Sequence, residues 1–155
     1  MYRAGAVLVL AGQAGFDARP IQGGRSTLVD DVARVEPAAL VLDSGLGTRP
    51  YAADLVAACA SRLPDLAIVV VVGRARPVGM LTVLEAGARA LVHRWCSPEE
   101  LSAAVAAALR SQNWVAAPMA GSLHAEMAAE ASGQRPPELS RRELDVLRSM
   151  STGAT

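Results

Sequence analysis

Ala67-Ile68-Val69-Val70-Val71-Val72 (AIVVVV, residues 67–72) is the stretch that decides the fold class of this 155-residue chain. Six consecutive apolar residues, five of them β-branched, predict a strand. They do not alternate with polar residues, which indicates that both faces of the strand are buried. Such strands are typical of parallel sheets covered by helices on both sides.

Further strand and helix signals alternate on either side of this stretch. Strands are predicted at Ala6–Leu10, Ala39–Leu42 and Ala90–Val92, with a short additional one around Arg19–Gln22. Helices are predicted at Ser26–Val35, Pro50–Leu63, Met80–Ala86, Ser97–Arg110 and Ser122–Ala131. Ser97 is the expected N-cap before Pro98, and Gly87 is the expected C′ glycine. The alternation predicts a three-layer α/β fold with a parallel sheet.

Composition excludes several classes of function. Fifteen acidic residues balance fifteen basic ones, so no global positive field favours nucleic acid or anionic membrane. Every basic residue is Arg, which excludes Schiff-base, P-loop and kinase-type lysines. No G-x-S-x-G motif occurs, and His93 and His124 have no plausible Ser or Cys nucleophile as partner. We therefore predict neither an enzyme nor a cofactor.

Three minor motifs favour structural interpretations. His93 and Cys96 have an H-x-x-C spacing but too few companions for a metal site. Gly23 to Ser26 could cradle a phosphate, although a loop followed by an N-cap explains it more simply. Cys59 and Cys96 lie on separate elements and are expected to be reduced thiols in a cytoplasmic protein. Ala4–Leu10 is interpreted as a strand rather than as a signal peptide, and no apolar run has transmembrane length.

The order of these elements resembles a receiver domain of the NarL/LuxR class of response regulators from two-component systems. Pro37–Asp43 (PAALVLD) is similar to the receiver strand that ends in the phosphoacceptor aspartate. Leu84–Ala88 and Ser97–Leu101 follow at the intervals of that family. The resemblance implies a flavodoxin-like (CheY-like) doubly wound parallel sheet. It is weakest at Gly12–Gly24, which is about ten residues too short for the usual first helix and second strand.

The resemblance places Asp43 at the phosphoacceptor position, but the other receiver positions are degenerate. Ala11 and Gly12 stand where the family has its metal-binding acids, Val72 replaces the usual hydroxyl residue, and Arg94 replaces the usual lysine. Transfer of a phosphoryl group to an aspartate needs a divalent cation. We therefore predict that Asp43 is not phosphorylated and instead forms an ion pair with Arg94.

Three arginines follow strands on the side where α/β sheets bind ligands. Arg74, Arg76 and Arg94 would make this edge positive, in contrast to the acidic edge of a phosphorylated receiver. The alternatives are an anion or ligand site and three solvated loop arginines.

The predicted domain organisation has three parts. Residues 1–111 form the receiver-like domain, residues 112–137 a partly helical linker, and residues 138–155 the start of a domain that resembles a LuxR-type helix-turn-helix. Ser140 and Glu143 form a capping box in the expected helix Leu139–Met150. The groove-reading helix of that family would come later. Arg141, Arg142 and Arg148 alone are therefore not expected to bind DNA specifically. The chain is either a fragment of a longer regulator or a truncated product.

These observations predict a regulatory, phosphorylation-independent domain of a transcription regulator. It would act through homodimerisation and through binding of an anionic ligand or a partner, with DNA binding only in a full-length protein. Ala103, Ala104, Ala106 and Ala107 are expected to offer a smooth helix surface for self-association. The alternatives are a protein-interaction module without ligand or DNA binding and, with least support, a small α/β enzyme.

Overall fold

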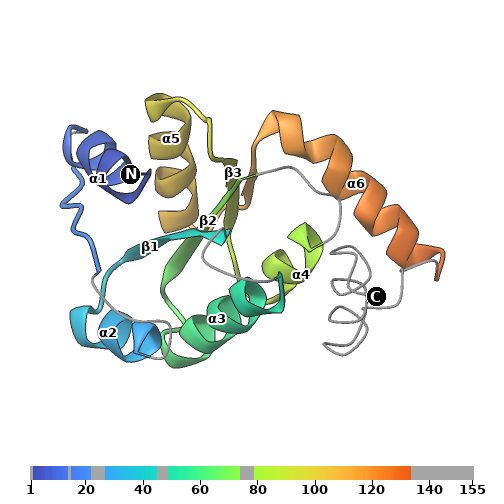
Figure 1. The fold of residues 1–155 in the computed structure, drawn as a ribbon, viewed down its shortest axis with the longest axis horizontal. Helices are drawn as coiled ribbons and strands as arrows, with labels where there is room; N and C mark the ends of the chain where they lie inside the picture. Colours follow the sequence, from blue (N-terminus) through green and yellow to red (C-terminus); the bar gives the residue numbers. More distant parts are fainter. Residues whose placement is uncertain (1, 14, 22–26, 45–48, 74–78, 134–155) are drawn as a thin grey trace, which may run out of the picture.

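In the computed structural model, residues 2–13, 15–21, 27–44, 49–73 and 79–133 are described. Their strands form one parallel sheet in the order β1-β2-β3-β4 (Figure 1). The strands are β1 (Ala39–Asp43), β2 (Ala67–Val72), β3 (Ala90–His93) and β4 (Trp114–Val115). The predicted strands in the regions of β1, β2 and β3 are thereby confirmed. The stretch from residue 19 to residue 21 forms no strand, and Gln22 lies outside the described residues.

β2 lies at the centre of the core, and its side chains divide by the period of two that a strand imposes. Ile68 and Val70 belong to one buried cluster, whereas Ala67, Val69 and Val71 belong to the other. Both faces of β2 are therefore buried, as its apolar run predicts.

Helices cover the two faces of the sheet unequally. They are α1 (Tyr2–Ala11), α2 (Leu28–Val35), α3 (Arg49–Arg62), α4 (Met80–Glu85), α5 (Pro98–Leu109) and α6 (Ala117–Ala131). α1 and α5 pack on one face, and α2, α3, α4 and α6 contribute to the cluster on the other (Figure 1). The predicted layered α/β architecture is confirmed.

The prediction of a strand at Ala6–Leu10 is wrong, because this segment forms most of α1. In a strand, Leu8 would share a face with Ala6 and Leu10. Instead Leu10 is buried and Ala6 is partly buried, while Leu8 is 74% exposed, which is the spacing of a helix. A short apolar run satisfies either pattern, and packing against α5 selects the helix.

Two helix termini follow their sequence signals. Ser97 caps α5, since its Oγ accepts a hydrogen bond from the Glu100 N–H at 3.1 Å. Gly87 has a φ of +115° after α4, and a Cβ at this position would lie 2.9 Å from the Cβ of Ala60. Only glycine fits this turn without strain and without displacing α3.

Residues 112–133 make closer contact with the sheet than a linker would. β4 pairs with β3, and α6 begins five residues earlier than predicted. Met119 and Ala116 are buried in the same cluster as α4. The division of the chain at residues 111 and 137 remains a prediction, but β4 and α6 pack as part of the receiver-like body.

Among the described helices, none has both the length and the apolar character that a membrane crossing requires.

Candidate functional site

Asp43 and Arg94 meet at the C-terminal edge of the sheet. Asp43 is the last residue of β1, and Arg94 directly follows β3. Neighbouring strands are about 4.8 Å apart, so the two backbones are separated by about 10 Å across the end of β2. The long arginine side chain bridges that gap, and its Nη2 donates to Oδ1 of Asp43 at 2.6 Å. The predicted ion pair is confirmed.

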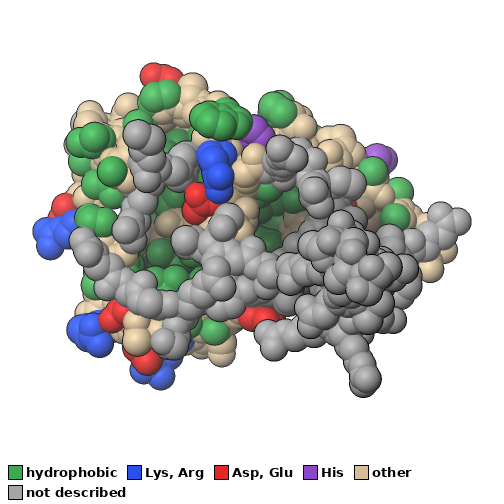
Figure 2. All heavy atoms as spheres, in the orientation of Figure 1, with side chains coloured by type: hydrophobic (Ala, Val, Ile, Leu, Met, Phe, Trp, Pro, Cys, Tyr) green, Lys and Arg blue, Asp and Glu red, His purple; other side chains and the backbone are tan. Residues whose placement is uncertain are grey.

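The pair is partly withdrawn from solvent. The side chains of Arg94 and Asp43 are 32% and 23% exposed. Screening by water is weaker here than in surface pairs such as Arg19–Asp17, whose side chains are about three-quarters exposed. Figure 2 shows a basic and an acidic side chain next to each other among hydrophobic groups on the face in view.

Gly73 makes room for the arginine. A Cβ at Gly73 would lie 3.0 Å from Cζ of Arg94 and 3.1 Å from its Nη2. The guanidinium therefore lies directly over the backbone that follows β2, where a side chain on residue 73 would require it to shift. The sequence analysis assigned no role to Gly73. The only feature that could have pointed to one was its position directly after a buried strand.

Replacing Gly73 with valine is expected to displace the Arg94 guanidinium from Asp43. The branched side chain would occupy the space over which the guanidinium lies, and the flexible arginine can move more easily than the backbone. Gly73→Ala should have a smaller effect of the same kind. A crystal structure of Gly73→Val should show the Nη2–Oδ1 distance beyond 4 Å. An unchanged ion pair would show that Gly73 is not what permits this geometry.

The residues that directly follow β1 and β2 in the sequence include no Asp or Glu. Residues 44–48 read SGLGT and residues 73–79 read GRARPVG. No group of three or more His, Cys, Asp or Glu residues comes together within the described ranges. Val72 ends β2 without a hydroxyl group, as expected. Residues 44–48 and 73–79 therefore supply no carboxylate that could bind a divalent cation.

The comparison of Ala11 and Gly12 with the metal-binding acids of receivers needs correction. That comparison assumed that both residues end a first strand. They instead end α1, where the Gly12 N–H donates to the Leu8 carbonyl at 3.0 Å. Residues 44–48 and 73–79 still contain no Asp or Glu.

Arg74 and Arg76 lie outside the described residues, as do Gly23–Ser26 and Leu139–Met150. Trp95, the residue after Arg94, belongs to the described part of the chain. The Trp95 side chain is 81% exposed there, and the Trp95 N–H donates to Nδ1 of His93 at 3.3 Å. A large exposed indole thus directly follows Arg94 in the chain.

No third His, Cys, Asp or Glu joins His93 and Cys96 in a cluster within the part of the chain that the structure describes. Nδ1 of His93 already accepts a backbone hydrogen bond. Burial, together with the nearby charge of Glu100, raises the pKa of the Cys96 thiol above its ordinary value. Cys96 also lines a mostly apolar cavity of about 170 Å³ between α1 and the start of α5. A protonated thiol beside an apolar cavity indicates packing rather than ligation.

Comparison with known proteins agrees with the receiver-like architecture. No family model matches the chain, and no curated protein matches it in sequence. Among solved structures, a LuxR-family two-component response regulator from Aurantimonas sp. SI85-9A1 is 17% identical, with a TM-score of 0.69 over 81% of this chain and 89% of that one.

Two structures of the RcsB response regulator are also similar. One, from Salmonella typhimurium, is 18% identical with a TM-score of 0.69, covering 99% of this chain and 74% of that one. The other, described as two RcsB dimers bound to two parallel DNAs, is 19% identical with a TM-score of 0.52, covering 84% and 61%. At these identities the likeness concerns the fold, and the chain has the CheY-like fold of response-regulator receiver domains.

Proposed function

We propose that this chain is the regulatory, receiver-like part of an atypical LuxR-type response regulator that works without phosphorylation. The ion pair between Asp43 and Arg94 supports the receiver-like part of this proposal, because Arg94 stands where the resemblance places a lysine. The phosphorylation-independent part rests on residues 44–48 and 73–79, which contain no Asp or Glu. In this geometry, the carboxylate at the phosphoacceptor position is held by a cation of the chain itself. The neighbouring loops contain no acids for Mg²⁺, so Asp43 serves as a structural charge at the edge.

The proposed input is an anionic small molecule or an acidic partner at the same edge. Arg74 and Arg76 follow β2 in the sequence, Arg94 follows β3, and Asp43 is the acid that pairs with Arg94. Three positive charges against one negative charge favour an anion.

The proposed output passes through dimerisation and through a DNA-binding domain after residue 137. On α5, Ala103 is exposed and Ala106 is partly exposed, whereas Ala104 and Ala107 pack on the sheet. Of the four alanines expected at the self-association surface, only Ala103 and Ala106 would therefore be accessible to a second copy. Specific DNA binding would require the complete C-terminal domain, since zero net charge supplies little counterion release.

A second candidate is a protein-interaction module without a ligand. The strong exposure of Trp95 at the edge favours this alternative, because exposed tryptophans are common centres of protein interfaces.

Thermal unfolding in inorganic phosphate or citrate separates the two candidates. With matched ionic strength in sodium chloride as the reference, either anion at ten times its dissociation constant should stabilise the protein by about 1.4 kcal/mol, or roughly 3–6 °C. Arg94→Ala should reduce the shift. Asp43→Asn removes the opposing negative charge and should enlarge it. Equal shifts in all three proteins, or none, would contradict an anion site and favour the interaction module.

A further inference from the structure

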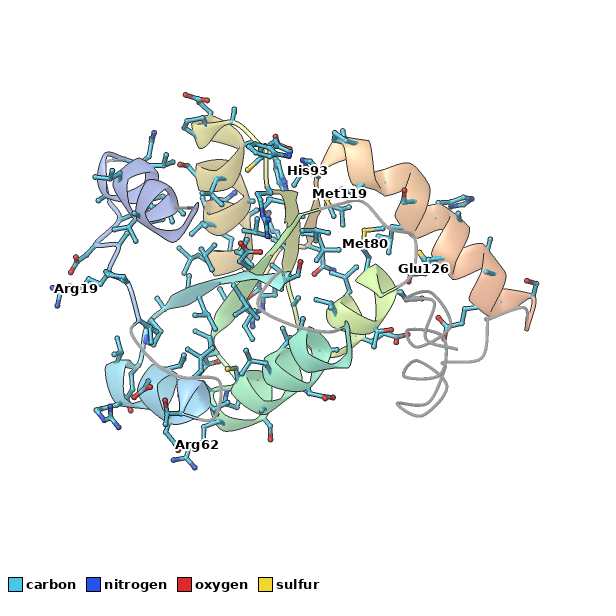
Figure 3. The ribbon with its side chains drawn as sticks, in the orientation of Figure 1. Arg19, Arg62, Met80, His93, Met119 and Glu126 are labelled. Carbon is cyan, nitrogen blue, oxygen red and sulfur yellow. The ribbon has the colours of Figure 1, made fainter. Side chains whose placement is uncertain are left out.

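Glu126 on α6 joins this helix to the beginning of α4. Its Oε2 accepts a hydrogen bond from the Leu81 N–H at 2.9 Å, and its Oε1 accepts one from the Gly79 N–H. Figure 3 shows Glu126 directed from α6 toward α4. Forty-five or more residues separate the partners along the chain, so this contact is tertiary.

α4 depends on this carboxylate for its N-terminal cap. The helix has six residues, and its N-cap is Gly79, which has no side chain to accept the first N–H groups. Unsatisfied N–H groups at a helix start carry partial positive charge, and a carboxylate stabilises them. Glu126 therefore supplies from another helix what α4 lacks in its own sequence.

A second, apolar attachment holds the first half of α6. Met119 is fully buried and belongs to the same core cluster as Met80, the first residue of α4 (Figure 3). Glu126 follows Met119 by seven residues, or about 10 Å along the helix. On the outer side of α6, Met127 is half exposed. The first half of α6 is thus attached through the core, and the Glu126 carboxylate adds a polar attachment in the second half.

α4 stands between α6 and the edge that carries Asp43. Met80 shares its cluster with Leu42, the residue before Asp43 in β1, and with Val70 of β2. The Gly79 and Leu81 N–H groups that bind Glu126 flank Met80 in the chain. A change in packing at the strand ends that moves Met80 would therefore also move both hydrogen-bond donors.

We propose that Glu126 is a latch that couples the edge of the sheet to the position of α6. In the latched state the start of α4 holds the second half of α6 against the body. When a ligand or partner displaces the start of α4, the carboxylate loses both donors, and the attachment of the second half of α6 to the body is weakened. This inference rests on the proposed regulatory function and names its route of output.

Hydrogen–deuterium exchange of the whole chain tests the latch. Glu126→Ala removes both acceptors while keeping helix propensity high in α6. Exchange of the Gly79 and Leu81 amides, and of the amides in residues 127–131, should rise at least tenfold. Residues 68–71 should be unchanged. Glu126→Gln keeps one acceptor oxygen without charge and should give a smaller rise.

Glu85→Gln is the matched control, since it removes the same charge at the opposite end of α4. It should leave the exchange of α6 unchanged. No increase in residues 127–131 of Glu126→Ala, or the same increase in Glu85→Gln, would overturn the latch.

The single variant Arg94→Ala tests whether the edge of the sheet is coupled to α6. It should raise the rate of amide hydrogen–deuterium exchange at Leu81 and at residues 127–131. The same substitution should add nothing in the Glu126→Ala background, because the latch is already open. If Glu126→Ala frees α6 but Arg94→Ala does not, the contact is a passive helix cap and the regulatory inference is wrong. Anion binding at the edge is measured separately by thermal shift, so its failure would be distinguishable from failure of the latch.

Discussion

Replacing Met119 with alanine is expected to lower the free energy of unfolding by about 2–5 kcal/mol, the usual cost of truncating a buried long side chain. Met119 has no exposed surface, and it packs in the cluster that includes Met80 of α4 and Leu91 of β3. Removing most of its side chain would leave a cavity between α6 and the sheet. Urea denaturation, with the slope of the transition compared between variants, measures the change.

Met127→Ala provides the matched control on the same helix. This methionine is 52% exposed, so its truncation should change the free energy of unfolding by about 0.5 kcal/mol or less. Equal small losses for both variants would mean that α6 does not pack on the body. The interpretation of residues 112–137 as a linker would then stand without qualification.

Arg94→Ala is expected to cost about 1–3 kcal/mol of stability at neutral pH, since it removes the cation that faces a partly buried carboxylate. Part of the loss comes from the packing of the guanidinium over Gly73. Denaturation of the variant, and of Arg94→Ala combined with Asp43→Asn, separates these two contributions. The double variant should recover part of the loss, because no carboxylate then lacks its cation.

Arg34→Ala is the control for an ordinary surface pair. Arg34 bonds Asp31 at 2.8 Å within α2, but its side chain is 74% exposed. Its removal should cost about 0.5 kcal/mol or less, because water screens the pair. A loss for Arg94→Ala no larger than this would show that the edge pair contributes no more than surface electrostatics.

The elements that were predicted correctly are those determined by residues within the element or directly beside it in the sequence. The run from Ala67 to Val72 favours a buried strand because five of its six residues are β-branched. Ser97 and Gly87 mark helix ends through their own backbone and side-chain chemistry. The Asp43–Arg94 pair was predictable because parallel strands bring their C-terminal ends to one edge. In each case, a few neighbouring residues or a single topological rule determine the outcome.

Elements fixed by tertiary contacts were not predictable in the same way. The apolar segment that forms α1 fits either a strand or a helix until α5 packs against it. The two residues of β4 are too few to show a period, and α6 is held by Met119 and Glu126 through partners distant in sequence. Gly73 matters only because Arg94 crosses over it. None of these partners can be read from the chain without its fold.

The central claim is that Asp43 occupies a phosphoacceptor position without accepting phosphate. The direct measurement is incubation of the protein with acetyl phosphate and Mg²⁺, followed by intact-protein mass spectrometry with and without hydroxylamine. Asp43→Asn serves as the control that cannot form an acyl phosphate at this position. We predict no hydroxylamine-labile phosphoryl adduct, with wild type and Asp43→Asn giving the same spectrum. A stoichiometric, hydroxylamine-labile adduct on wild type that is absent from Asp43→Asn would contradict the account.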